Sequence, residues 1–266
     1  MNMLYEPPEK PPMKKGRIFT ILLIILLDSL LVFALILFFP LLTGSANQRL
    51  ISSDWSGYAV ATNLNNPQPL VTRIEASWTV PKVSFSIRES YSATWIGVGG
   101  QFGFDSTLIQ TGTEQDSING VGKYSAWYEL LPNDEVTIAS LSVSAGDRIT
   151  SSISLSDPTA NTWLIEIHDY TGATSEQSFQ NSFTYPSSML SAEWIVERPT
   201  VNNVLRNLAD FSELTFTGCS ATVGGKVVTI SSLPSIQITM YSQNIELTSV
   251  SPLASNGSSF TVNYIG

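Results

Sequence analysis

The chain has 266 residues, with 13 Lys or Arg, 22 Asp or Glu and a formal net charge of −9 at pH 7. This length suffices for one large domain with an appendage, and the negative charge argues against electrostatic binding of nucleic acid. Cys219 is the only cysteine and His168 the only histidine, which excludes an intrachain disulfide and argues against a zinc site of cysteines or several histidines. A catalytic triad would depend on that one histidine, which lies in an alternating, strand-like segment.

An apolar segment dominates the N-terminal part of the sequence. Residues 18–43 are almost all Leu, Ile, Phe, Val and Ala. About 25 residues of helix rise roughly 37 Å, which exceeds the bilayer core of about 30 Å. Four Lys or Arg residues precede the segment and only Arg49 closely follows it, so residues 1–17 should be cytoplasmic. We therefore expect a transmembrane signal-anchor helix at 18–43, a linker at 44–53, and a domain at 54–266 that is extracellular and membrane-anchored, or secreted if the helix is cleaved.

Short runs of Val, Ile, Thr and aromatic residues follow, separated by Gly, Pro, Asn and Ser clusters, and no helical period longer than two turns occurs after residue 50. The runs predict strands at residues 57–62, 73–80, 93–98, 106–113, 123–131, 136–143, 148–155, 162–170, 175–179, 192–197, 214–223, 236–241 and 260–265. So many strands do not fit a small barrel. We expect an all-β domain, a jelly-roll-like or concanavalin-like β-sandwich of two large antiparallel sheets.

Two of these strands carry polar residues that could act together. The segment Leu-Ile-Gln-Thr-Gly contains Gln110, and Ala-Glu-Trp-Ile-Val-Glu contains Glu193 and Glu197. Alternate residues of a strand share a face, so Glu193 and Glu197 would point the same way, and so would Trp127 and Glu129. If these strands lie in one sheet, its face could collect an amide, carboxylates and indoles.

The chemistry that such a face supports is attack of water on an amide bond. A glutamate near water can act as general base, and a glutamine side chain can hold the water and donate to the oxyanion. When the intermediate collapses, the protonated glutamate can donate to the leaving nitrogen. Neither a metal nor a cofactor is needed.

Segments at residues 55–58, 95–100, 108–112, 124–129 and 192–197 follow the order found in the glutamic peptidases, or eqolisins. From about Trp55 to the C-terminus the chain resembles this family, as a membrane-anchored, prokaryotic-type member. The resemblance implies a sandwich of two antiparallel sheets and an acid-acting endopeptidase that is insensitive to pepstatin. It also implies protein or peptide substrates, and we expect a monomer.

In that family the catalytic pair is a glutamine and a glutamate, and the matching residues are Gln110 and Glu197. The resemblance makes Glu197 the general base and then the general acid, and it makes Gln110 the group that positions water and stabilises the oxyanion. It gives supporting or substrate-binding roles to Trp55, Trp95, Trp127, Glu129 and Glu193.

The chain also departs from the family pattern. Gly99 and Ser125 stand where fungal members carry Asp, Arg198 follows Glu197 where they carry another Asp, and Leu131 replaces a substrate-side tyrosine. With fewer carboxylates around it, Glu197 should experience less like-charge repulsion. We therefore expect activity to extend nearer to neutral pH than in those members.

Two other functions fit a polar sandwich face. A carbohydrate-binding or adhesive β-sandwich would bind a ligand without turnover. A glycosidase could use Glu129 and Glu197 as paired carboxylates, and it would then depend on Glu129 and not on Gln110. The peptidase hypothesis predicts the reverse dependence.

Overall fold

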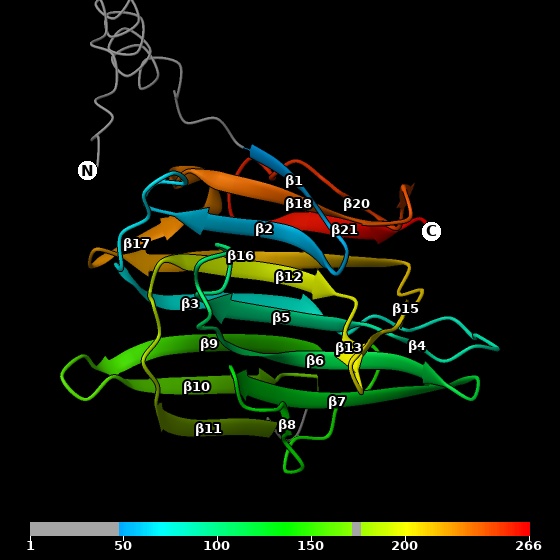
Figure 1. Ribbon diagram of the computed structural model, residues 1–266. Coiled ribbons are helices and arrows are strands. Elements are labelled where there is room, and N and C mark those ends of the chain that lie inside the picture. Colours follow the sequence, from blue (N-terminus) through cyan, green and yellow to red (C-terminus); the bar gives the residue numbers. More distant parts are fainter. Residues whose placement is uncertain (1–47, 172–176) are drawn as a thin grey trace, which may run out of the picture. The chain divides into compact units, whose positions relative to one another are not determined.

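The computed structural model describes residues 48–171 and 177–266, which fall within one compact unit at residues 47–266. The strands form two large sheets (Figure 1). In the part of the chain that is described, no helix is long and apolar enough to cross a membrane. The expected cytoplasmic tail at 1–17 and signal-anchor helix at 18–43 lie outside the described residues.

The larger sheet has 11 strands, and β2, β12, β5, β6 and β7 follow one another across it (Figure 1). Its pairs are antiparallel except β1 with β18 and β4 with β15. The strands in spatial order are β1 (Gln48–Ser52), β18 (Ser235–Ser242), β2 (Trp55–Ala61), β12 (Ser191–Glu197), β5 (Ala93–Val98), β6 (Ile109–Ile118), β4 (Ser90–Tyr91) and β15 (Asn207–Leu208), with β19 (Ile245–Glu246) on β18, β7 (Val121–Leu130) on β6 and β8 (Val136–Thr137) on β7.

The second sheet has eight strands and is antiparallel. Its strands are β11 (Gln177–Thr184), β10 (Thr162–Asp169), β9 (Arg148–Asp157), β3 (Val71–Thr79), β16 (Glu213–Val223), β21 (Phe260–Tyr264) and β20 (Thr248–Val250), with β17 (Lys226–Thr229) on β16. A short ribbon of β13 (Thr200–Val201) and β14 (Val204–Leu205) and the 3₁₀ turn η1 (Ile230–Ser232) complete the described elements. The expected all-β fold with two large antiparallel sheets is confirmed.

Strict alternation along the central strands gives the larger sheet two different faces. Ile96 and Trp194 belong to the main hydrophobic core, whereas their chain neighbours Trp95 and Ile195 belong to a smaller apolar cluster. Because neighbouring residues of a strand point to opposite sides, this second cluster lies on the face turned away from the main core. That face carries the candidate site.

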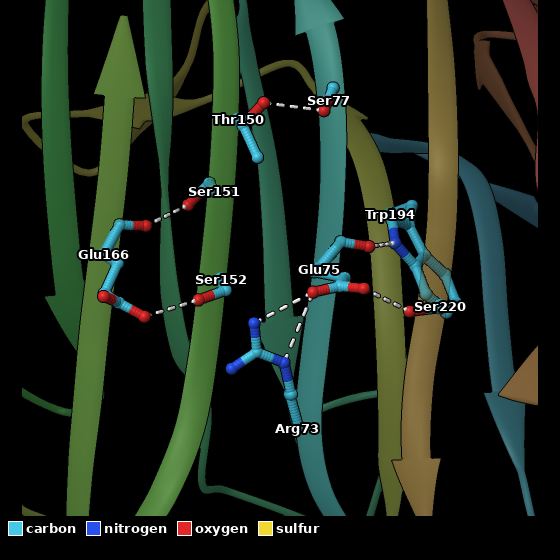
Figure 2. A network of polar contacts seen from close by, with 9 residues as sticks. All are labelled: Arg73, Glu75, Ser77, Thr150, Ser151, Ser152, Glu166, Trp194 and Ser220. Carbon is cyan, nitrogen blue, oxygen red and sulfur yellow. Dashed lines mark hydrogen bonds and ion pairs between the residues drawn. The ribbon is translucent and has the colours of Figure 1, made fainter. Parts of the chain in front are cut away.

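A polar network covers part of the second sheet (Figure 2). Arg73 pairs with Glu75 at 2.9 Å, and the Ser220 hydroxyl donates to the same carboxylate at 2.8 Å. Trp194 of the larger sheet donates its indole N–H to the Glu75 backbone oxygen at 3.0 Å. The Glu75 carboxylate is therefore satisfied by Arg73 and Ser220. The Trp194 hydrogen bond also joins the two sheets.

Some strand boundaries differ from the prediction. Residues 136–143 were expected to form a strand, but only Val136–Thr137 pairs as β8. Ile138 and Leu141 are buried in a turn, where the Leu141 N–H donates to the Ile138 oxygen at 3.1 Å. Apolar side chains after Thr137 are therefore buried without strand pairing, and this burial explains the strand-like sequence pattern. The expected linker at 44–53 contains β1, which pairs with β18.

Gly112 provides a test of the close packing between β5 and β6. A Cβ atom added to Gly112 would lie 2.0 Å from the Thr94 backbone oxygen, whereas one added to Gly103 would meet nothing within 4 Å. We expect Gly112→Ala to lower the free energy of unfolding by about 2 kcal/mol or more, because a backbone atom must move. Gly103→Ala should change it by less than about 1 kcal/mol. Urea denaturation of both variants measures the difference, and equal stabilities would contradict this packing.

Candidate active site

Five neighbouring strands, β2, β12, β5, β6 and β7, bring all the predicted site residues onto one sheet face. Their register forms three parallel rows of residues, two positions apart along each strand. The rows are Ala59–Glu193–Gly97–Gln110–Glu129, then Gly57–Ile195–Trp95–Gly112–Trp127, and then Trp55–Glu197–Ala93–Glu114–Ser125. Glycines and alanines thus alternate with the large and polar side chains.

Gln110 is held by Glu129 on the neighbouring strand. The Gln110 Nε2 donates to Glu129 Oε2 at 2.5 Å, and Gln110 is buried. Its Oε1 atom is also buried and has no hydrogen-bond partner among the described residues. Since Nε2 carries two hydrogens, the amide retains one donor and a free acceptor for other groups.

Glu197 is held by Trp95. The Trp95 Nε1 donates to Glu197 Oε2 at 2.7 Å, and the Trp55 ring packs edge-on against Trp95 with centroids 5.0 Å apart. Burial raises the pKa of Glu197 to about 8, opposed by the Trp95 hydrogen bond and reinforced by the charges of Asp54 and Glu129. Glu197 is therefore a carboxyl whose proton can be exchanged near neutral pH.

Gln110 and Glu197 face the same side of the sheet without touching each other. They lie on strands separated by β5 and in rows separated by the row that contains Trp95 and Trp127. No hydrogen bond between them occurs in the described part of the chain. The Trp127 Nε1 is buried and has no partner within the described residues. Unused polar atoms from Gln110 and Trp127 thus occur on the face where a substrate and water would meet.

Glu193 differs from the other acids because it is completely buried. Both of its carboxyl oxygens are buried without a hydrogen-bond partner among the described residues, and burial raises its pKa well above the usual range. An ionised carboxylate in such surroundings would be very costly, so burial favours the neutral form of Glu193. Glu193 packs beneath the site face as a buried side chain.

Three further acids of this face were not found from the sequence. Glu114 and Asp116 continue the alternation of Gln110 along β6, and Glu135 follows β7. Burial is the largest cause that raises the pKa of Glu114 and of Asp116, to about 8 for Asp116, whereas the side chain of Glu135 is exposed. The predicted strand ended at residue 113, whereas β6 continues to Ile118, so the signal was present beyond the assumed boundary.

That Glu197 experiences less like-charge repulsion than in fungal members stays a prediction, but neighbouring acids do act on it. Asp54 and Glu129 both raise its pKa, and Glu135 interacts with Glu114, Glu129, Asp116 and Glu197. Gly99 and Ser125 lack the acids that family members carry at these positions. The same face nevertheless carries carboxyl groups at other positions. Ser125 itself donates to Glu114 at 3.4 Å.

These raised pKa values predict how stability depends on pH. A carboxyl with a higher pKa in the folded than in the unfolded chain stabilises the fold below its unfolded pKa, and that stability is lost as the pH rises through the folded pKa. For Glu197 and Asp116 the window runs from 4.5 or 3.8 up to about 8. We expect the free energy of unfolding, measured by urea denaturation, to fall across this window. It should fall less steeply in Glu193→Gln, because this variant lacks one carboxyl whose pKa is raised by burial. A rise with pH would contradict the assignment.

The chain is similar to known proteins over most of its length. The family model described as Peptidase A4 family matches residues 53–264. Aspergillopepsin-2 of Aspergillus niger is 27% identical over 243 residues, which cover 84% of this chain and 81% of that protein. Scytalidopepsin B of Scytalidium lignicola is 26% identical over 220 residues, 80% of each chain.

Solved structures share the fold. Scytalido-glutamic peptidase with a transition state analog inhibitor matches with a TM-score of 0.66 and 22% identity, over 80% of this chain and 99% of that chain. Aspergilloglutamic peptidase from Aspergillus niger matches with a TM-score of 0.58 and 27% identity, over 66% and 99%. Since the family model covers most of the sequence, the chain belongs to the Peptidase A4 family, the glutamic peptidases.

Proposed function

We propose that Glu197 and Gln110 hydrolyse peptide bonds by directing a water molecule onto the carbonyl carbon. The chain is a glutamic-type endopeptidase that acts at acid pH. The assignment of residues rests on one observation. The Glu197 carboxyl and the Gln110 amide lie on one face, each is oriented by a hydrogen bond, and the amide keeps polar atoms available for other partners. Trp95 fixes the Glu197 carboxyl, and Glu129 fixes the Gln110 amide, whose Oε1 remains without a partner among the described residues.

The reaction follows from these two groups. Ionised Glu197 takes a proton from the water as the oxygen–carbon bond forms, while Gln110 Oε1 accepts the other water hydrogen. The second Nε2 hydrogen of Gln110 donates to the oxyanion of the tetrahedral intermediate. When the carbon–nitrogen bond breaks, Glu197 returns its proton to the leaving nitrogen. Each group ends in its starting state.

The working pH is set by two opposing effects, one on catalysis and one on stability. Glu197 must be ionised to act as base, and its raised pKa makes the ionised fraction grow towards pH 8. The buried carboxyls of the face favour the folded state at lower pH. We propose that activity extends from the acid range towards neutrality.

Protein or peptide substrates are supported by the relatives. The scytalido-glutamic peptidase structures contain transition state analogs, one of them peptide-based, and an eqolisin structure contains the tripeptide Ala-Ile-His. The glycosidase alternative required Glu129 and Glu197 as a carboxyl pair. In the structure Glu129 accepts a hydrogen bond from Gln110 instead, which favours a supporting role for Glu129.

The proposal for location and assembly rests on the sequence. The apolar segment at 18–43, with four Lys or Arg residues before it, supports a membrane-anchored protein of prokaryotic type whose catalytic domain lies outside the cell, or is secreted after cleavage. We propose that the protein is a monomer. Sedimentation of the detergent-extracted protein and protease accessibility in intact cells would test these two points.

The residue assignments predict a graded mutational pattern. With a denatured protein as substrate, Glu197→Gln should lower kcat by roughly 10²–10⁴-fold because the general base is lost. Gln110→Ala should lower it by roughly 10²–10³-fold because the oxyanion donor is lost. Glu129→Gln should cost about tenfold, the value of a positioning hydrogen bond. Pepstatin and a chelator should not inhibit the wild type, and full activity of Glu197→Gln would refute the assignment.

A second prediction concerns the indole N–H of Trp95. This hydrogen bond stabilises ionised Glu197, so Trp95→Phe should raise the Glu197 pKa further and move the acid limb of the kcat/KM profile to higher pH by about one unit. Trp78→Phe is the matched control, since Trp78 is equally buried but donates to Thr113 on the core side. An acid limb that moves equally in both variants, or in neither, would contradict the role of Trp95.

A further inference from the structure

Tyr185 connects the second sheet to the strands that carry Gln110 and Glu129. It directly follows β11 and is buried, with 6% of its surface exposed. Its backbone N–H donates to the Asn161 oxygen at 2.9 Å, and its backbone oxygen accepts from Trp163 Nε1 at 3.1 Å. The backbone of Tyr185 is therefore fixed to the β9–β10 side of the molecule.

The Tyr185 side chain reaches the larger sheet at the ends of β6 and β7. Its hydroxyl accepts from the Leu108 N–H at 2.8 Å and donates to the Leu131 oxygen at 2.9 Å. Leu131 N–H donates directly to the Leu108 oxygen at 3.0 Å, so these residues form the last rung of the ladder. In an antiparallel pair the second bond of such a rung would join Leu108 N–H to Leu131 oxygen. The tyrosine hydroxyl takes that place and bridges the two strands.

This bridge lies two residues from Gln110 on one strand and two residues from Glu129 on the other. Leu108 precedes Gln110 by two positions, Leu131 follows Glu129 by two, and Gln110 and Glu129 are register partners. Both leucines pack in or against the apolar cluster of the site face. Burial raises the pKa of the Tyr185 hydroxyl, opposed by the Leu108 hydrogen bond, so the proton that bonds to Leu131 is retained.

We infer that Tyr185 is a positioning residue that holds Gln110 and Glu129 in catalytic register from the opposite sheet. The inference rests on the proposed function of Gln110. Without the hydroxyl, the Leu108 N–H and the Leu131 oxygen lose a common partner, and the end of the β6–β7 ladder can separate. The short Gln110–Glu129 hydrogen bond joins the register partners two residues from this rung, so the orientation of the amide changes when the rung opens.

The test compares Tyr185→Phe with Tyr58→Phe in the full-length protein. Tyr58 is equally buried, and its hydroxyl donates to the Ser251 oxygen and accepts from Gln237, away from β6 and β7. Both variants should lower the melting temperature by similar amounts. Tyr185→Phe should lower kcat roughly tenfold or more with KM changed by less than about twofold. Tyr58→Phe should retain both constants, and equal kcat values in the two variants would overturn the inference.

Two measurements keep the inference separate from the peptidase assignment. In NMR spectra the side-chain amide resonances of Gln110 should shift in Tyr185→Phe and not in Tyr58→Phe, whether or not the wild type cleaves a substrate. In the wild type the Leu108 amide should be protected from hydrogen exchange although it precedes β6. Absence of cleavage by the wild type would refute the proposed function alone. Unchanged Gln110 resonances, or an unprotected Leu108 amide, would refute the inference.

Discussion

Burial of several carboxyl groups on one face of the larger sheet is the constraint on which the site depends. Glu193 and Glu197 lie on the same strand, and burial raises the pKa of both. A carboxylate removed from water must be hydrogen-bonded or become neutral. The sheet meets this requirement differently at each position: Trp95 donates to Glu197, Gln110 donates to Glu129, and burial favours the neutral form of Glu193. The same burial that disfavours the charged form makes Glu197 able to accept and return a proton near neutral pH.

The sandwich gives this face rigid support from behind. Alternation along β5 and β12 places Ile96 and Trp194 in the main core while Trp95 and Ile195 pack under the site. Each residue that contacts the catalytic groups is therefore flanked by residues anchored between the sheets. Positions on regular strands are more precise than positions on loops, which suits a reaction that depends on the geometry of one water molecule.

Much of this architecture could be predicted from the sequence, because β-branched and aromatic alternation is a local signal. Strands β5 and β12 were predicted within one residue, and the two-residue period correctly placed Trp127 and Glu129 on one face. Residues 136–143 were misassigned, since their apolar side chains are buried without strand pairing. Glu135 and Tyr185 could not be predicted, because their roles depend on contacts between segments far apart in the chain.

The most direct test of the account is a ¹³C NMR titration of the Glu197 carboxyl in the full-length protein. The account predicts a midpoint near 8, because burial and the neighbouring acids outweigh the Trp95 hydrogen bond. A midpoint at or below the ordinary value of 4.5 would show that burial does not hold the proton on Glu197 towards neutral pH. That result would contradict the central claim that a partly buried, carboxyl-rich sheet face controls the catalytic proton.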